Sequence, residues 1–273
     1  PNALLEEPTD ARLIDRQFVA NLLPERLRAC HKGENGSVLI VAGSRSMPGA
    51  AILAAMGAMR AGAGLVTVAS VPSVCEAVTA VLPEALLLPL PEDGGCIAPE
   101  AAELILQRQS RYHSAVFGPG LTHDAPVQAM MGCLWRQWTR PAVIDADALN
   151  AVAAGLTLPA CECVLTPHPG EMSRLLECSI GEIQADRFRT VCEAVARFKR
   201  CVLLKGAYSI IGEPDQPMLV NSTGNPGQAS GGMGEVVGTR LTVAVPADAS
   251  EDERAGWTRM PRALGVADVR LVP

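Results

Sequence analysis

A glycine-rich segment that ends on a carboxylate is the strongest candidate for chemistry in this chain. Residues 221–235 read NSTGNPGQASGGMGE and close on Glu235. Glycines at this density let the backbone take positive φ and turn several N–H groups toward one point. Such an arrangement suits a phosphate, above all where a helix begins. The carboxylate behind it sits where a phosphoryl or hydroxyl group would react, although this segment alone could also be a flexible glycine loop.

Other polar residues recur directly after short apolar runs. These positions are Gly43-Ser44, 118–120 (GPG), Asp145 with Asp147, 166–171 (TPHPGE) and Lys205-Gly206. In a parallel sheet, ligands bind beyond the carboxyl ends of the strands. Five such coincidences point to a single functional rim.

The segment 145–150 (DADALN) carries two close carboxylates. Asp145 and Asp147 could form a polar edge for a substrate, or hold a hydrated Mg²⁺ through water. Asp147 could equally cap the helix that follows. The residues leave both interpretations open.

Prolines on both sides hold His168 in a rigid, extended turn, where it could act on a substrate or serve as a structural hydrogen-bonding group. Glu171, at the start of the next predicted helix, could simply complement the helix dipole. Lys205 could contact a nucleotide phosphate, or it could be a strand-end lysine in solvent.

These residues need a scaffold of alternating strands and helices. Apolar runs predict strands at 37–43, 65–70, 85–88, 114–118, 141–147, from 163 and at 201–206, and a hairpin of 208–212 with 218–221. Helices are predicted at 10–23, 47–64, from Pro72, and at 99–109, 126–138 and 183–199. This alternation predicts an α/β fold with a mainly parallel sheet and helices on both faces.

Composition narrows the classes of function. The 273 residues carry a net charge of -6 and only 3% aromatic residues, with no basic stripe, which argues against nucleic acid as a partner. No apolar run of about 18 residues predicts a membrane span. The nine cysteines are odd in number and lack metal-site spacing, so we expect them to be mostly reduced and buried in a cytoplasmic protein.

Seven stretches, taken in order, resemble the ADP/ATP-dependent NAD(P)H-hydrate dehydratases of the ribokinase-like superfamily. They are HKGENGSVLIVAGS (31–44), GAAILAAMGAMRAGAGLVTVA (49–69), FGPGL (117–121), VIDADALN (143–150), LTPHPGEMSRLL (165–176), LLKG (203–206) and the glycine-rich segment 221–235. The resemblance covers about residues 31–238. It implies a three-layer ribokinase-like sandwich.

The resemblance also implies an activity and a set of site residues. The family eliminates water from the S epimer of hydrated NADH or NADPH, driven by hydrolysis of ADP or ATP, with Mg²⁺ expected alongside the nucleotide. Matching positions for the hydrated dinucleotide are Ala50, Gly120, His168 and Glu235. Matching positions for the nucleotide are Lys205, Gly206, Ala207, Tyr208, Ser209, Asn225 and Gly234. Of these, Glu235 and His168 are the expected catalytic residues, and a homo-oligomer is expected.

The resemblance implies a division of the chain into a polar, helical lead-in (1–30), a dehydratase domain (31–237) and an atypical tail (238–273). Many family members follow an epimerase domain, and a chain that begins at Pro1 without Met is compatible with such a fusion. The tail lacks the family's helical pattern. It could be a divergent or disordered end, or follow a shifted reading frame after about residue 237.

Glu235 departs from the aspartate of the family pattern. The extra methylene moves the carboxylate by about 1 Å, and a misplacement of that size can cost roughly 10²-fold in rate. Two alternatives therefore stand beside the dehydratase: a vitamin-precursor kinase of the same superfamily, and a catalytically impaired protein that still binds nucleotide.

Overall fold

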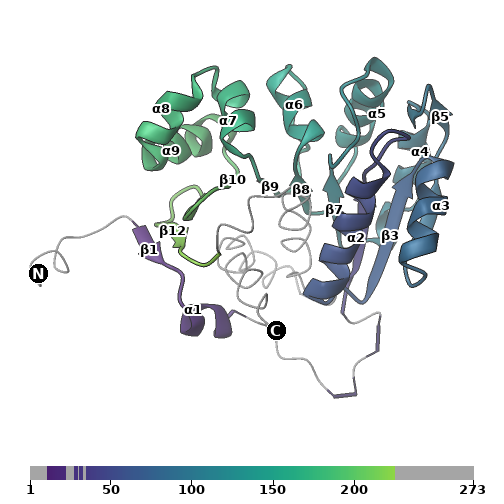
Figure 1. The fold of residues 1–273 in the computed structure, drawn as a ribbon, viewed down its shortest axis with the longest axis horizontal. Coiled ribbons are helices and arrows are strands. Elements are labelled where there is room, and N and C mark those ends of the chain that lie inside the picture. Colours follow the sequence, from purple (N-terminus) through teal and green to yellow (C-terminus); the bar gives the residue numbers. More distant parts are fainter. Residues whose placement is uncertain (1–10, 23–27, 30, 33–34, 225–273) are drawn as a thin grey trace, which may run out of the picture.

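The computed structural model describes residues 11–22, 28–29, 31–32 and 35–224, which alternate between strands and helices (Figure 1). The strands are β1 (Ala11–Leu13), β2 (Ser37–Val41), β3 (Leu65–Ser70), β4 (Leu86–Pro89), β5 (Glu92–Asp93), β6 (Cys96–Ile97), β7 (Ser114–Phe117), β8 (Ala142–Ile144), β9 (Cys163–Leu165), β10 (Cys201–Leu204), β11 (Ser209–Gly212) and β12 (Met218–Asn221).

The helices lie mostly between successive strands of the sheet. They are α1 (Arg16–Ala20), α2 (Pro48–Ala61), α3 (Pro72–Val81), α4 (Ala101–Leu106), a 3₁₀ turn (Gln109–Arg111), α5 (Ala125–Trp135), α6 (Asp147–Ala153), α7 (Pro169–Leu176), α8 (Ile180–Ala185) and α9 (Arg187–Phe198). Proline at the first or second helical position starts α2, α3, α5 and α7, as its fixed φ favours.

One large sheet organises the described part of the chain. Its strand order is β1-β12-β11-β10-β9-β8-β7-β2-β3-β4. Every pairing from β10 to β4 is parallel, whereas β11 runs antiparallel to both β10 and β12. The predicted parallel sheet and its terminal hairpin are therefore confirmed.

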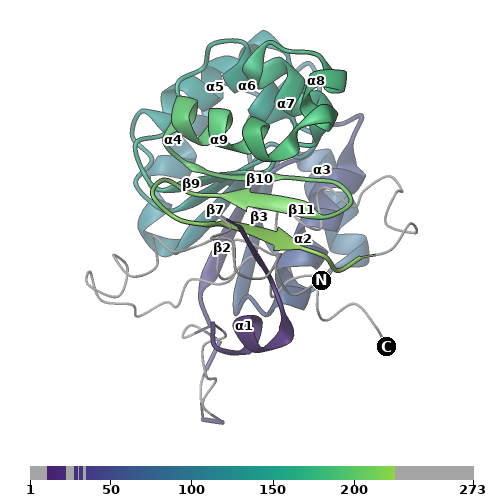
Figure 2. The ribbon, with the colours of Figure 1, turned by 90° about the vertical axis from the view of Figure 1, so that its left-hand side faces the viewer.

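Helices cover both faces of this sheet (Figures 1 and 2). The helices α2 and α3 pack against each other and against β2, β3 and β4. The chain then crosses to the far side of β2, so right-handed connections put α4–α9 on the opposite face. The result is the predicted three-layer arrangement.

The core owes its character to small and branched apolar residues. All five residues of β2 are buried, as expected for a strand covered on both faces. Three of the scarce aromatic residues meet in the core, where Phe117 contacts the rings of Trp135 and Trp138 edge-on, with centroids 6.0 and 5.4 Å away.

The predicted helix over 10–23 is wrong in its first half. Residues Ala11–Leu13 form β1, which pairs in parallel with β12, and the helix spans only Arg16–Ala20. Asp15 is the N-cap of this helix, and its side chain accepts a hydrogen bond from the Phe18 N–H (2.7 Å). Pairing with a distant strand overrides the local helical preference here.

The predicted helix over 183–199 is two helices. The backbone of Asp186 is not helical (φ -148°, ψ 86°), and its carboxylate caps α9 by accepting from the Arg189 N–H. Aspartate side chains compete with helical hydrogen bonds in this way, so the chain turns between α8 and α9.

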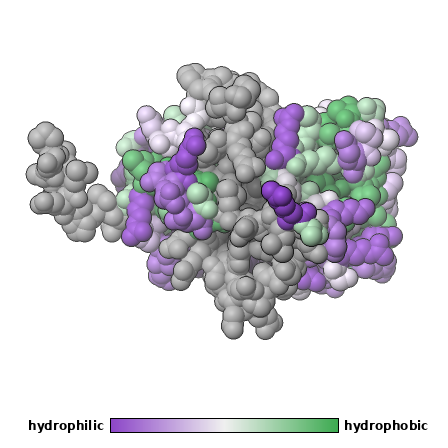
Figure 3. Space-filling model, turned by 90° about the horizontal axis from the view of Figure 1, so that it is seen from below, coloured by the Kyte–Doolittle hydropathy of each residue, from purple (hydrophilic) through white to green (hydrophobic). Residues whose placement is uncertain are grey.

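The surface exposes apolar residues at both borders of the sheet. Leu13 on edge strand β1 is 66% exposed and Leu86 on edge strand β4 is 49% exposed. From below, hydrophobic residues flank the grey residues on both sides (Figure 3). Within the described residues, no helix is long and apolar enough to span a bilayer.

Candidate functional site

The five strand ends singled out by the sequence lie next to one another. They belong to β10, β9, β8, β7 and β2, which are consecutive in the sheet. Main-chain hydrogen bonds continue past the strands and tie the loops together. These bonds are Lys205 N–H to Pro167 O (2.9 Å), Thr166 N–H to Ile144 O (3.2 Å), Asp145 N–H to Phe117 O (3.0 Å), Gly118 N–H to Val41 O (3.2 Å) and Gly43 N–H to Pro119 O (2.7 Å). The expected single rim is confirmed.

Ala50 and Gly120 meet at this rim. Gly120 has φ 65°, and a Cβ on it would lie 2.7 Å from the Ala50 Cβ. Ala50 lies in the first turn of α2, whose N-cap residue Met47 provides no side-chain hydrogen bond. Pro48 has no N–H and the Ala50 N–H donates to the Met47 carbonyl (3.4 Å), so it is mainly the positive end of the helix dipole that favours an anion here. Two residues predicted to bind the dinucleotide are thus adjacent, 70 positions apart in sequence.

A buried ion-pair cluster lies beside them. Lys205 Nζ is 2.8 Å from Asp145 Oδ1 and 3.8 Å from Glu171 Oε2. Asp145 is 1% exposed, Glu171 5% and the Lys205 side chain 15%. Lys205 is therefore not a lysine in solvent, and its charge is shared between two carboxylates inside the rim.

The pKa of Glu171 is displaced by its burial in this cluster. Burial raises its pKa from 4.5 to about 7, against the opposing effect of the Lys205 charge. Its carboxylate also accepts from the His168 main-chain N–H (2.8 Å). The residue does more than complement a helix dipole, because it joins the α7 N-terminus to the Lys205 cluster.

His168 is the N-cap of α7. Its Nδ1 accepts from the N–H groups of Gly170 (3.0 Å) and Glu171 (3.4 Å), completing a reciprocal capping box with Glu171. Burial, then the Lys205 and Arg174 charges, lowers the pKa of His168. An accepting Nδ1 in a neutral ring leaves the proton on Nε2, which lies 3.4 Å from Glu171 Oε1. His168 is therefore both a structural cap and a hydrogen-bond donor at the rim.

Asp147 does not cap its helix. The N-cap position of α6 is Ala146, a non-glycine residue at φ 48° and ψ -119°. Asp147 Oδ2 instead accepts from the Thr122 N–H (2.8 Å), and Oδ1 lies 3.2 Å from His123 Nε2. It fixes the loop after β7, while strain at Ala146 sits between the two aspartates.

The predicted metal ligands offer one available oxygen. Among the described residues, Asp145 Oδ2 is buried without a hydrogen-bond partner, whereas both Asp147 oxygens have neighbours. The same residues contain no cluster of three or more ligating groups. This donor set fits a hydrated Mg²⁺ that arrives on nucleotide phosphates, not an all-protein cage.

The predicted nucleotide segment forms an open loop between β10 and β11. Gly206 (φ 139°) and Tyr208 (φ 56°) both take positive φ, and Tyr208 is 63% exposed. The Ser209 hydroxyl donates to the Gly206 carbonyl (3.1 Å). Ala207 is likewise exposed.

Arg187, at the start of α9, contacts this loop and was not predicted from the sequence to lie at the site. Its guanidinium donates to main-chain carbonyls of this loop 17 to 20 residues away. The sequence did contain a signal for this contact. A positive side chain in the first turn of a helix is unfavourable for the helix dipole, so an arginine there suggests a role outside the helix.

Asn225, Gly234 and Glu235, with most of the glycine-rich segment and the tail 238–273, lie outside the residues that the structure describes. Eight described cysteines are free, of which Cys75, Cys96, Cys163 and Cys201 are buried. Half of them, not most, are therefore core residues.

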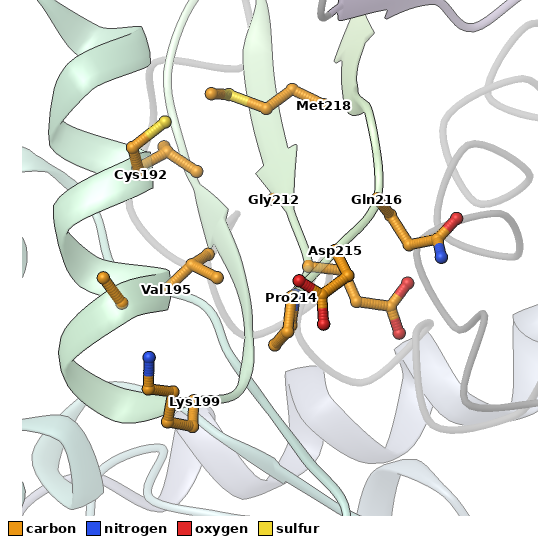
Figure 4. Close-up of a pocket in the computed structure, with 11 residues that line it drawn as sticks. Cys192, Val195, Lys199, Gly212, Pro214, Asp215, Gln216 and Met218 are labelled. Atoms are coloured by element: carbon orange, nitrogen blue, oxygen red, sulfur yellow. The ribbon is translucent and has the colours of Figure 1, made fainter.

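A cavity of about 310 Å³ lies away from the rim (Figure 4). It opens between α9 and the β11–β12 turn, with Lys199, Asp215 and Met218 in its lining. Because Gly212 pairs with Val202 near the start of β10, this turn is at the opposite edge of the sheet. The cavity takes no part in the site described above.

Comparisons with known proteins agree with this geometry. A family model described as NAD(P)H-hydrate dehydratase matches residues 38–242. The chain is 40% identical over 231 residues to a bifunctional NAD(P)H-hydrate repair enzyme of Moorella thermoacetica, covering 83% of the chain and 43% of that protein. It is 36% identical over 223 residues to the ADP-dependent (S)-NAD(P)H-hydrate dehydratase of Bacillus subtilis, covering 81% and 76%.

A solved structure supports the same assignment. The ADP/ATP-dependent NAD(P)H-hydrate dehydratase of Bacillus subtilis, co-crystallised with ATP and Mg²⁺, superposes with a TM-score of 0.76 at 30% identity, covering 93% of this chain and 85% of that one. The chain spans about half the length of the bifunctional relatives it matches. The fold is ribokinase-like, and the chain belongs to the NAD(P)H-hydrate dehydratase family.

Proposed function

We propose that this chain dehydrates the S epimer of hydrated NADH or NADPH, using ADP, or ATP in its place, and so restores the reduced cofactor. The observation that carries the proposal is the single rim of five adjacent strand ends, where Ala50 meets Gly120 beside the buried Lys205 cluster. The family match over residues 38–242 supports the same reaction.

The reaction joins phosphoryl transfer to an elimination. The ring hydroxyl oxygen attacks the terminal phosphorus of ADP, its proton passes to a base, and AMP leaves. The C–O bond of the phosphorylated ring then breaks with loss of phosphate, and a proton leaves the neighbouring carbon. Positioning and electrostatic stabilisation of the transferred group supply most of such catalysis. Glu235 is the proposed base for the hydroxyl proton, at the position where the family places an aspartate.

His168 fits the role of a donor to the dinucleotide. Its Nδ1 is engaged by the α7 main chain, so Nε2–H is the remaining donor, and it would turn from Glu171 Oε1, 3.4 Å away, to the substrate. A neutral donor polarises a carbonyl or holds a hydroxyl without adding a charge that must be desolvated. We assign His168 to orientation of the substrate and not to proton abstraction.

The nucleotide is proposed to lie on the 205–209 loop, with Asn225 and Gly234 contributing from the glycine-rich segment. Mg²⁺ bound to the phosphates would neutralise the charge that develops there. Asp145 would hold it through water, because Oδ2 is the available buried oxygen of the described cluster.

The partners of the chain form part of the proposal. The bifunctional relatives motivate an upstream epimerase domain. The exposed Leu13 and Leu86 on the edge strands motivate a homo-oligomer, which light scattering across a dilution series would test. A cytoplasmic location is proposed from the free cysteines.

Recovery of NADH absorbance from its hydrate tests the proposed function. We expect recovery with nucleotide present and none without it, and comparison of ADP with ATP fixes the preference. A stable phosphorylated vitamin alcohol, with no loss of hydrate, would instead favour the kinase. Nucleotide binding without turnover would favour the impaired protein.

A further inference from the structure

Arg187 holds one side of the 205–209 loop through its guanidinium group. Nη1 donates to the Ala207 carbonyl, and Nη2 lies 3.3 Å from the carbonyl oxygens of both Leu204 and Lys205. A Cβ on Gly206 would lie 3.1 Å from Nη2. One side chain therefore engages three carbonyls of a short loop and packs beneath its glycine.

These contacts fix the direction of the loop's N–H groups. In a trans peptide the carbonyl and the following N–H point in opposite directions, and the described residues contain no cis bond. Because the Lys205 and Ala207 carbonyls face Arg187, the N–H groups of Gly206 and Tyr208 face away from it. Both residues are exposed, so these N–H groups turn toward the open side of the loop.

Among the described residues, no carboxylate pairs with the Arg187 guanidinium. Within the described part of the chain its contacts are carbonyl oxygens, and its buried Nε lacks a hydrogen-bond partner. Burial lowers its pKa, which marks a guanidinium taken partly out of water. Its place at the first position of α9 also opposes the helix dipole. Helix stability therefore does not account for an arginine here.

We propose that Arg187 is a positioning residue for the nucleotide. It turns the loop so that the N–H groups of Gly206 and Tyr208 face the phosphates, and its positive charge attracts the same anion. This inference rests on the proposed nucleotide-dependent function and goes beyond it, because Arg187 lies outside the segments that carry the family resemblance.

Calorimetric titration with ADP and steady-state kinetics of the full chain test the role. For Arg187→Gln we expect ADP affinity to fall by about tenfold or more, since hydrogen bonds to charged groups are lost. The KM for ADP should rise while the KM for the hydrate stays within about twofold. Arg187→Lys keeps the charge but cannot span three carbonyls, so it should bind ADP nearly as weakly.

Arg189→Gln is the matched control. Arg189 lies on the same helix, is 62% exposed and pairs only loosely with Glu193 at 3.6 Å. The Arg189→Gln variant loses the same charge, but the substituted side chain does not contact the 205–209 loop. Its ADP affinity should match that of the parent protein. Thermal unfolding without ligand identifies a temperature at which every variant is folded.

Unchanged ADP affinity in Arg187→Gln, or full recovery in Arg187→Lys, would overturn the inference. Absence of ADP binding by the parent chain would overturn it as well. A parent chain that binds ADP through Arg187 but never restores NADH would overturn the proposed function and leave the inference standing.

Discussion

Lys205 lies between two buried carboxylates, and this placement determines what each group can do. Its Nζ pairs with Asp145 at 2.8 Å, while Glu171 at 3.8 Å receives a weaker share of the charge. Charges so far from water depend on their partners, because desolvation is repaid only by close pairing. Removing one charged side chain of the cluster therefore leaves another buried charge without its partner.

Asp145→Asn should lower the free energy of unfolding by about 3 kcal/mol, the cost of breaking a buried pair. Urea denaturation measures the change. Glu177→Gln is the control, because it removes an ion pair with Arg197 in which both side chains are well exposed. That loss should cost less than about 1 kcal/mol. Equal effects of the two substitutions would show that the Lys205–Asp145 pair contributes no more to stability than an exposed ion pair.

Glu171→Gln should change how stability depends on pH. The folded-state pKa is raised to about 7, so the native protein holds this proton more tightly than the unfolded chain. The resulting stability is full below pH 4.5 and is lost as pH rises through about 7, amounting to about 3 kcal/mol at most. Denaturation between pH 4 and 8 should show this decline in the parent protein and a flatter profile in the variant. Parallel profiles would contradict the assignment.

Glu235→Asp should raise the rate of dehydration. Shortening the side chain returns the carboxylate to the family position, and a shift of about 1 Å can be worth roughly 10²-fold. Single-turnover kinetics with saturating nucleotide compare the two proteins directly. A turnover that does not rise would show that Glu235 is correctly placed in this chain.

At the scale of elements, the rim depends on close approach between loops. A Cβ on Gly118 would lie 1.8 Å from the Asp145 carbonyl oxygen, at a backbone φ of 127°. The β7 loop therefore passes directly over the end of β8. Only glycine permits both this conformation and this contact.

Gly118→Ala should destabilise the protein more than Gly155→Ala. Both glycines have positive φ, but a Cβ on Gly155 meets nothing within 4 Å. The control carries only backbone strain of about 1–2 kcal/mol, whereas Gly118→Ala adds overpacking of typically 1–3 kcal/mol. Thermal and urea unfolding of both variants measure the difference. Equal losses of stability would show that the close approach to the Asp145 carbonyl is not the reason for a glycine at position 118.

The strands of the rim were predictable because each is a short apolar run that ends at glycine or a polar residue. Hydrophobic pattern also predicted the parallel sheet and its hairpin. The edge strand β1 was not predictable, since its three residues gain strand structure only by pairing with β12. Hydrophobic periodicity also predicted one continuous helix over 183–199, whereas Asp186 separates α8 from α9.

Side-chain partners were the least predictable part of the site. The sequence placed Asp145, Lys205 and His168 at strand ends, and the structure confirms those positions. It could not show that His168 caps a helix through Nδ1, nor that Lys205 points inward at Asp145. Such contacts join residues up to 60 positions apart, and local pattern carries no information about them.

At the scale of the whole molecule, an acidic chain must attract anionic ligands. The net charge is -6, while the proposed nucleotide and dinucleotide are both negative. Local features therefore have to offset the overall field: the α2 N-terminus, and Arg187, whose contacts among the described residues are carbonyl oxygens. The chain spans about half the length of its bifunctional relatives. Whether it is active without the rest of such a protein is answered by assaying the purified chain.

The most direct measurement supplies the purified chain, and its Glu235→Asp variant, with resolved epimers of hydrated NADH and with ADP. NADH, AMP and phosphate are followed together. The account predicts one NADH and one AMP for each ADP consumed, from the S epimer alone, with the variant faster than the parent chain. Nucleotide hydrolysis without recovery of NADH by either protein would contradict it.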